Sequence, residues 1–322
     1  MKVLVTGAAG FIGSKLMYVL RERGDEVVGI DNYNDYYDVR LKEARVAAFG
    51  LDVIRMDLAD KEAIDRLFAA QRFDKVVNLA AQAGVRYSIT NPYAYLQSNL
   101  VGFLNILEAC RNFGVKHLVY ASSSSVYGMN AKVPYSEDDK VDNPVSLYAA
   151  TKKSNELMAH SYCKLYGIAM TGLRYFTVYG PWGRPDMAPM LSASAISKGE
   201  TIKVFNHGDM IRDFTFIDDI VAGTVGCIDR EPALDANGLR YRVYNIGCSH
   251  PVKLMDFISE MEEALGVEAK KEFLPMQPGD VYQTNADTTR LETEIGYKPA
   301  VRLHEGIGRF IDWYRSDLNP LR

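Results

Sequence analysis

Tyr148 and Lys152 lie four residues apart in the segment Tyr148-Ala-Ala-Thr-Lys152. On a helix, side chains with this spacing share a face, so the lysine ammonium can lie near the phenol. A neighbouring positive charge favours phenolate and lowers the pKa of a tyrosine. Such a pair could remove a proton from a hydroxyl while the hydrogen on the same carbon leaves as hydride to a nucleotide cofactor. The spacing alone is common on amphipathic helices, so its significance depends on the segments around it.

A glycine-rich segment precedes this pair in the chain. Gly7, Gly10 and Gly13 follow an expected strand and open an expected helix, with Phe11 and Ile12 inside the motif. Glycines there permit a tight turn and close approach of the backbone to a pyrophosphate, and the helix N-terminus favours the anion. The spacing is G-x-x-G-x-x-G, which in isolation could mark only a glycine-rich turn. In this position it predicts a dinucleotide-binding loop.

Asp31 ends the second expected strand, where an acidic side chain can hold the adenosine ribose of a dinucleotide. A carboxylate there would repel a 2′-phosphate, so the residue favours NAD over NADP. The alternative is an aspartate that only caps a helix or a turn.

Two further strand ends and one helix carry candidate cofactor contacts. Asp57 and Leu58 follow the third strand and could contact the adenine. Small side chains follow the fourth strand and would let the cofactor pass close to the backbone. Asn99, in the next expected helix, could reach the same region or lie on the helix surface. The residues at the end of the fourth strand and directly after it are Leu79, Ala80 and Ala81.

Four consecutive serines, Ser122, Ser123, Ser124 and Ser125, end the fifth expected strand. Serines at a strand end can simply satisfy loose backbone groups. If they face Tyr148, their hydroxyls could instead hydrogen-bond the reacting oxygen and relay its proton.

The elements that must position these residues alternate between strands and helices. β-branched apolar runs predict strands, and apolar periodicity predicts helices between them. Gly24 and Gly114 are expected to cap two of the helices at their C-terminal ends. This alternation predicts an α/β fold with a doubly wound parallel sheet. The expected strands are 2–5, 26–30, 53–56, 75–79, 117–122 and 169–174, and the expected helices are 11–23, 61–71, 93–113 and 146–166.

After Tyr179 the pattern changes to a turn-rich loop, a helix at 189–198, a strand at 201–205, and helices at 252–265 and 303–314. This order of segments predicts a smaller C-terminal lobe over the carboxyl edge of the sheet, where such folds bind ligands. We expect residues 1–180 to form the dinucleotide-binding domain, with 213–248 returning to it. Residues 181–322 would mainly form the second lobe, and the two would share a core.

Composition limits the class of protein. The chain has 322 residues, of which 48% are hydrophobic, enough for one large domain or two joined lobes. A net charge of −4 argues against nucleic-acid binding. The four cysteines include no Cys-x-x-Cys, so we expect reduced thiols and no metal site. Since no signal peptide or membrane-spanning run is recognised, we expect no membrane contact and a cytoplasmic location.

Together the motifs TGAAGFIG, NLAA, SSSSVYG, YAATK and RYFTVYGPWGRPDMA, with Asp31, resemble the extended short-chain dehydrogenase/reductases, specifically the nucleotide-sugar epimerases. The resemblance covers essentially the whole chain. The segments Tyr179–Ala188 and Met210–Phe214 are most similar to those of the UDP-glucuronate 4-epimerases. This resemblance implies a Rossmann fold, an NAD cofactor and a UDP-sugar substrate.

The resemblance also implies residue roles. Tyr148 would be the base, and Lys152 would orient both it and the nicotinamide ribose. Ser123 matches the catalytic serine of the wider epimerase family, Ser125 matches a hydroxyl residue near the sugar's 4-hydroxyl, and which of the two matters more stays open. Tyr175 would border the nicotinamide, with Ser122 nearby.

For the substrate, the resemblance places Arg212 at the UDP diphosphate, Lys203 and Val204 at the uracil, and Asp280 at the uridine ribose. A uronic acid carboxylate needs a partner charge when it is buried. Arg184 could supply this charge, with Arg86 a second candidate, although either could be an ordinary exposed arginine. Ser124 and Thr177 complete the expected sugar contacts.

Related enzymes share oxidation at C4 and then diverge. Dehydratases have an Asp-Glu pair where this chain has Ser124 and Ser125, and UDP-glucuronate decarboxylases have Glu in place of Ser125. The resemblance therefore favours 4-epimerisation of UDP-glucuronate to UDP-galacturonate. UDP-glucose/UDP-galactose 4-epimerase, UDP-glucuronate decarboxylase and a non-catalytic NAD sensor remain alternatives. Members of the family often dimerise through two helices, here 93–113 and 146–166, so we expect a homodimer.

Overall fold

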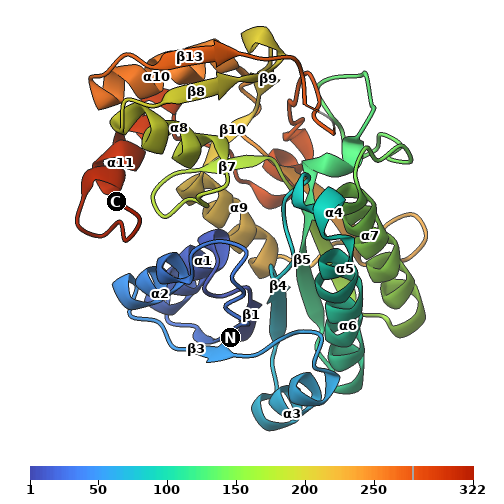
Figure 1. Cartoon of the computed structure of the whole chain (residues 1–322). Helices are drawn as coiled ribbons and strands as arrows, with labels where there is room; N and C mark the ends of the chain where they lie inside the picture. The colour runs from blue at the N-terminus through green and yellow to red at the C-terminus, as the bar shows by residue number, and fades with distance from the viewer. Residues whose placement is uncertain (278) are drawn as a thin grey trace.

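The computed structural model describes residues 1–277 and 279–322. Its larger part is a seven-stranded parallel sheet with the order β11-β6-β5-β4-β1-β2-β3 (Figure 1). The order reverses between β1 and β4, so the crevice at their carboxyl ends is the place where such a sheet binds ligands. The predicted doubly wound fold is confirmed. The strands are β1 (Lys2–Thr6), β2 (Glu26–Asp31), β3 (Val53–Arg55), β4 (Lys75–Asn78), β5 (His117–Ser123), β6 (Ala169–Tyr175) and β11 (Tyr241–Ile246).

Helices cover both faces of the sheet, and each face has its own cluster of buried apolar side chains. The helices on one face are α1 (Phe11–Glu22), α2 (Val39–Ala48) and α9 (Ile217–Asp229). Those on the other are α3 (Lys61–Gln71), α6 (Gly102–Asn112) and α7 (Leu147–Tyr166), with the short segments α4 (Tyr87–Thr90), α5 (Pro92–Tyr95), η1 (Leu96–Val101) and η2 (Ser124–Tyr127) near them.

Helix α7 carries the Tyr148–Lys152 pair and has clear signals at both ends. The Ser146 side chain accepts a hydrogen bond from the Ala149 N–H at 3.1 Å, which caps the first turn. Gly167 follows the last turn with φ of +70°, a left-handed conformation that suits glycine. The helix predicted at 146–166 is therefore confirmed, and Tyr148 lies in its first turn.

The structure differs from the sequence prediction between residues 93 and 113. The single helix expected there is divided into α5, the π-helical segment η1 and α6. The wider turn of η1 contains Asn99, whose side chain is directed inward to the backbone of Gln82. A π-turn adds a residue to the helical repeat, so apolar periodicity does not reveal it.

The helices α2 and α9 were not predicted, and neither was the short α4. In α2 the buried face contains the charged side chains of Lys42 and Arg45 beside Leu41, so the helix lacks an ordinary apolar stripe. In α9, Gly223, Gly226 and β-branched residues weaken the helical signal. The first two residues of the helix predicted at 252–265 instead form strand β12.

The smaller lobe lies over the carboxyl edge of the sheet (Figure 1, yellow to red). One buried apolar cluster includes Phe11 of the sheet domain and Met190, Phe257 and Phe310 of this lobe, so the shared core expected from the sequence is present. The lobe and its connections contain β7 (Thr177–Tyr179), α8 (Ala188–Ser197), β8 (Thr201–Val204), η3 (Phe205–Gly208), β9 (Ile211–Arg212), β10 (Phe214–Phe216), β12 (Val252–Lys253), α10 (Leu254–Leu265), β13 (Lys270–Phe273), η4 (Leu291–Ile295) and α11 (Leu303–Arg315).

Among the described residues, the helices include none with the length and apolar character needed to cross a membrane.

Candidate active site

A cavity of about 370 Å³ opens at the carboxyl ends of the central strands. It is lined by most of the residues that the sequence singled out. These are Gly7, Gly10, Phe11, Ile12, Asp31, Asp57, Leu58, Leu79, Ala80, Ala81, Ser122, Ser123, Ser124, Ser125, Tyr148, Lys152, Tyr175, Thr177 and Arg184. The predicted residues that do not line it are Gly13, Arg86, Asn99, Lys203, Val204, Arg212 and Asp280.

The glycine-rich loop fits a dinucleotide. A Cβ at Gly7 would lie 2.8 Å from the Ala80 nitrogen, and one at Gly13 would lie 2.1 Å from the Gly7 oxygen, so larger residues would push the loop away from β4 or from α1. No side chain caps the N-terminus of α1, and Phe11 and Ile12 in its first turn line the cavity. The loop therefore offers a helix N-terminus to an anionic group. Gly13 contributes by packing and not by lining the cavity.

Asp31 ends β2 at the cavity wall and is only 7% exposed. Its carboxylate accepts hydrogen bonds from the N–H groups of Ala9 at 3.2 Å and Tyr33 at 2.8 Å. The Lys42 Nζ lies 3.7 Å from the same carboxylate. Lys42 was missed because nothing in the sequence shows that this lysine faces inward.

The serines at the end of β5 divide into two groups. The Ser122 hydroxyl donates to Glu156 Oε1 at 2.7 Å, and Glu156 in turn binds the Arg174 guanidinium at 2.8 and 2.9 Å. Ser122 is thus tied to a buried ion pair behind the cavity. The Ser123 hydroxyl instead donates to the Ser125 hydroxyl at 3.1 Å, so these two are linked within the cavity wall.

Tyr148 and Lys152 both line the cavity, as the sequence predicted. Burial raises the pKa of Tyr148, and the hydrogen bond with Ser123 and the charge of Arg184 act in the opposite direction. The pKa of this phenol is thus raised in the structure, not lowered as expected, and an effect of Lys152 on it stays a prediction.

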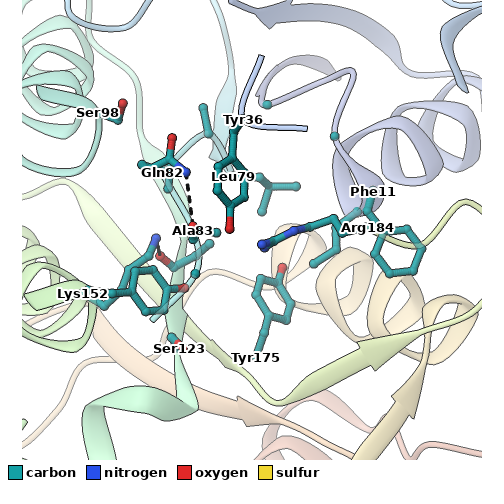
Figure 2. A pocket seen from close by; sticks show the side chains of 18 of the residues that line it. Phe11, Tyr36, Leu79, Gln82, Ala83, Ser98, Ser123, Lys152, Tyr175 and Arg184 are labelled. Carbon is teal, nitrogen blue, oxygen red and sulfur yellow. Dashed lines mark hydrogen bonds between the residues drawn. The ribbon is translucent and has the colours of Figure 1, made fainter. Parts of the chain in front are cut away.

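Lys152 is 3% exposed, and its Nζ donates to the Ala121 carbonyl oxygen at 2.8 Å. Burial lowers the pKa of Lys152 to about 8. Figure 2 shows Lys152 and Ser123 on one side of the cavity, and Arg184 and Phe11 on the other.

Asn99 is buried in η1 and does not line the cavity. Its Nδ2 donates to the Gln82 carbonyl and to the Thr151 hydroxyl, each at 3.0 Å, and its Oδ1 accepts from the Gln82 N–H at 2.8 Å. Gln82 itself lines the cavity. Asn99 therefore fixes the segment after β4 to helix α7.

Arg184 extends into the cavity toward the hydroxyl of Tyr36 (Figure 2). Its Nε and Nη2 bind the Asp186 carboxylate at 3.1 and 2.5 Å, and the Tyr36 hydroxyl donates to the same carboxylate at 3.0 Å. Burial, reinforced by Asp186, raises the pKa of Tyr36 to about 12. The sequence analysis missed Tyr36, which no motif marks and which approaches Arg184 only in the fold.

The residues expected to hold the nucleotide lie outside this cavity. Arg212 Nη2 binds Asp280 at 2.8 Å, and its guanidinium also donates to the carbonyls of Ile211 and Tyr282. Burial lowers the pKa of Arg212, although Asp280 acts in the opposite direction. Lys203 is exposed and Val204 is buried in β8.

Arg86 is also outside the cavity lining. Its guanidinium carbon lies 5.5 Å from the centre of the Phe205 ring, so Arg86 reaches from the sheet domain to the turn after β8.

Comparison with known proteins identifies the family of the chain. Residues 3–247 match the NAD dependent epimerase/dehydratase family. The chain belongs to this family. NAD is the cofactor of this epimerase/dehydratase. The close packing of the glycine loop fits such a dinucleotide.

Individual relatives show which members of the family the chain is similar to. The chain is 48% identical over 328 residues to UDP-glucuronate 4-epimerase 4 of Arabidopsis thaliana, covering 98% of this chain and 75% of the relative. The crystal structure of UDP-glucuronic acid 4-epimerase from Bacillus cereus, in complex with UDP-glucuronic acid and NAD, matches with a TM-score of 0.89 and 36% identity over 97% of this chain and 98% of that one.

A UDP-glucose 4-epimerase from Thermotoga maritima with UDP-glucose matches with a TM-score of 0.88 and 29% identity, over 98% of this chain and 99% of that one. This member of the epimerase/dehydratase family is thus a nucleotide-sugar epimerase with a sequence close to the UDP-glucuronate 4-epimerases.

Proposed function

We propose that this enzyme interconverts UDP-glucuronate and UDP-galacturonate by inverting C4 of the sugar. The observation that carries the proposal is that Tyr148, Ser123 and Arg184 line one cavity next to the glycine loop. Oxidation at C4 requires a base for the hydroxyl proton and an acceptor for the hydride, and a buried uronic acid carboxylate requires a cation. The similarity to proteins named UDP-glucuronate 4-epimerase supports the same assignment.

Tyr148 acts as the base that takes the proton of the 4-hydroxyl, through Ser123 or directly. NAD, when bound against the glycine loop, would supply the acceptor for the C4 hydride and its donor in the return step. The resulting 4-keto sugar turns within the cavity and presents its other face. Tyr148 then gives the proton back to the 4-oxygen, and the product is the C4 epimer. Ser125, linked to Ser123, helps to fix the 4-oxygen.

Lys152 has a positioning function in this scheme. Its Nζ binds the Ala121 carbonyl directly before the serine run, so it holds α7 against the end of β5. We assign it the orientation of Tyr148 and of the nicotinamide ribose. Its charge would stabilise phenolate if the ammonium moves toward the phenol when ligands bind.

Arg184 is assigned to the carboxylate of the uronic acid. The 4-keto form of glucuronate is a β-keto acid, which loses CO2 when the C5–carboxylate bond aligns with the carbonyl π system. Arg184, with Ser124 and Thr177 in the same cavity wall, would hold the carboxylate out of this alignment. Changing Arg184→Ala should weaken UDP-glucuronate binding and increase the UDP-pentose by-product. Unchanged affinity and no extra CO2 would remove Arg184 from this role.

The UDP end is assigned to the smaller lobe. We propose that Arg212 binds the diphosphate, Lys203 and Val204 border the uracil, and Asp280 holds the uridine ribose. Residues 181–322 would thus form most of the UDP-sugar lobe, and residues 1–180 with 213–248 the NAD domain.

One other activity has a specific observation in its favour. The match to a UDP-glucose 4-epimerase over nearly the whole chain makes UDP-glucose the second candidate substrate. The hydroxyl side chains at Ser124 and Ser125 cannot act as carboxyl acids or bases, which disfavours the dehydratase and decarboxylase reactions.

The deciding experiment is incubation of the purified protein with UDP-glucuronate, with and without added NAD, followed by separation of the C4 epimers. We expect an equilibrium mixture of UDP-glucuronate and UDP-galacturonate. UDP-glucose, tested in parallel, should react more slowly. Faster turnover of UDP-glucose would make the second candidate the function, and CO2 as the main product would indicate a decarboxylase.

We further propose a homodimer in the cytoplasm. Apolar side chains are exposed along α5, η1, α6 and α7, including Tyr93 at 76%, Leu157 at 58% and Leu165 at 68%. A patch of this kind marks an interface. Four unpaired cysteines suit a reducing compartment. Leu157→Glu should convert the dimer to a folded monomer in light scattering, whereas a monomeric wild-type protein would contradict the dimer.

A further inference from the structure

Arg45 is the largest side chain in the described structure that is fully removed from solvent. It lies on the inward face of α2, one turn after Leu41 and Lys42. Arginine is rarely buried unless its charge is paired. Nothing in the mechanism above uses this residue.

The partners of Arg45 come from three separate segments. Its Nη1 donates to the Ala9 carbonyl at 3.2 Å and to the Tyr37 hydroxyl at 2.7 Å. Its Nε and Nη2 donate to the Trp182 carbonyl at 3.0 and 2.7 Å. Within residues 1–277 and 279–322, no carboxylate forms an ion pair with it. The side chain thus joins backbone groups and does not neutralise an acid.

On the cofactor side, Arg45 fixes the orientation of one peptide in the glycine loop. Ala9 is buried, its N–H donates to Asp31 and its carbonyl is held by Arg45. A carbonyl oxygen facing the cavity would repel an anionic group at the N-terminus of α1. Arg45 keeps this oxygen in the protein interior.

On the sugar side, Arg45 holds a residue in an unfavourable conformation. Trp182 has φ of +68°, a region that bulky residues rarely adopt. Its ring packs against Trp313 and Phe49, with ring centres 5.1 and 6.1 Å away. With the ring anchored on one side, two N–H groups of Arg45 hold the carbonyl on the other. Such outliers persist only where the surroundings over-determine them.

The conformation of Trp182 sets the direction of the loop that follows. Gly183 N–H donates to the Gly180 carbonyl at 3.2 Å, which closes a tight turn, and Arg184 then enters the cavity. The same guanidinium therefore determines the backbone of the glycine loop and of the loop that carries Arg184.

We propose that Arg45 is a positioning residue that couples the dinucleotide half of the site to the sugar half. By holding Ala9 and Trp182 in one arrangement, it makes the binding of NAD and of a uronic acid mutually favourable. The identity of the sugar rests on the function proposed above, whereas the coupling to NAD does not.

The test compares Arg45→Met, Arg45→Lys and Tyr37→Phe with the wild type, each also in a Tyr148→Phe background that prevents turnover. Calorimetry measures the affinity for NAD after removal of bound dinucleotide, and for UDP-glucuronate with and without saturating NAD. The ratio of the two UDP-glucuronate affinities is the coupling. Lys42→Met is the matched control, since Lys42 is a buried cation of the same helix that contacts Asn34 but not Trp182.

Arg45→Met should weaken NAD binding by roughly tenfold or more, as expected for losing charged hydrogen bonds. It should also bring the coupling close to one and reduce the preference for UDP-glucuronate over UDP-glucose. Arg45→Lys should recover part of the NAD affinity and part of the coupling. Tyr37→Phe should reduce both quantities slightly. Lys42→Met should weaken NAD binding but retain the coupling.

An arginine with only a structural function would lower the melting temperature and the folded fraction, but not the affinities or coupling of the folded protein. That result would overturn the proposal. If Arg45→Met does not fold, wild-type coupling in both Arg45→Lys and Tyr37→Phe would overturn it. If the wild type binds UDP-glucose but not UDP-glucuronate, the proposed function fails, and the NAD affinities with UDP-glucose as second ligand still test Arg45.

Discussion

The catalytic and nucleotide halves of the proposed site are built differently. The catalytic half takes Ser123, Ser125, Tyr148 and Lys152 from β5, η2 and α7, and all four line one cavity. The nucleotide half takes its residues from short strands and loops of the smaller lobe. There, Arg212 is bound to Asp280 and lies outside the cavity.

The two halves differ in how far their side chains are already in place for a ligand. Residues at the end of a buried strand and in the first turns of a capped helix have fixed positions, so the catalytic half is preorganised. In the nucleotide half, Arg212 satisfies its charge within the protein. A diphosphate at the proposed Arg212 site would therefore either displace Asp280 and the neighbouring carbonyl or bind beside them.

The largest expected effect concerns the preorganised half. Tyr148→Phe removes the proton acceptor but retains the ring, so kcat should fall by about 10³-fold or more, as for loss of a general base. The affinity for UDP-glucuronate should change little. Steady-state kinetics and calorimetry measure the two quantities. Near-normal turnover in this variant would show that another group is the base and that the proposed division of the site is wrong.

The second prediction concerns the nucleotide half. Arg212→Ala should raise KM for UDP-glucuronate by roughly 10- to 100-fold, because a charged hydrogen bond to phosphate is lost, with a smaller effect on kcat. Arg212→Lys should recover only part, since an ammonium lacks the planar fork. An equal loss of kcat in Arg212→Ala would mean that this half also acts in the chemical step.

The smallest expected effect is on stability and concerns Lys152. Burial lowers the pKa of Lys152 to about 8 in the folded protein, whereas the unfolded chain keeps the lysine protonated up to its ordinary pKa of 10.5. Below pH 8 the folded protein holds a buried charge at a cost, and this cost is relieved as the pH rises from 8 to 10.5.

Lys152→Met should therefore have a higher free energy of unfolding than the wild type at pH 7, by on the order of 1 to 3 kcal/mol as measured by urea denaturation. The advantage should shrink at pH 9 and above. A variant that is less stable at pH 7 would show that the bond to the Ala121 carbonyl outweighs the buried charge.

Much of the fold could be predicted from the sequence because its signals are local. The β-branched strands, the Ser146 cap and the glycines after the helices act on neighbouring residues, and these elements are confirmed. Helix α2 was missed because Lys42 and Arg45 face inward, where apolar side chains are expected. The π-turn at Asn99 was missed because it interrupts the helical repeat.

Within the candidate site, the sequence predicted residue types but not partners. It identified Arg184 but not Tyr36 or Asp186, which bind each other across 150 positions of the chain. The sequence also identified the serine run. It could not show that the Ser122 hydroxyl donates to Glu156 while the Ser123 hydroxyl donates to Ser125. Contacts of this kind depend on how β5, β6 and α7 pack.

The sequence by itself determined the glycine loop, the serines at the strand end and the spacing of Tyr148 and Lys152, since these depend on residues close in the chain. Only the tertiary structure decided that Lys152 binds the Ala121 carbonyl and that Arg184 enters the cavity that Tyr148 lines. Only the fold shows that Arg45 joins two loops. Charge interactions and hydrogen bonds depend on distance and burial in space, and neither quantity is written in the order of residues.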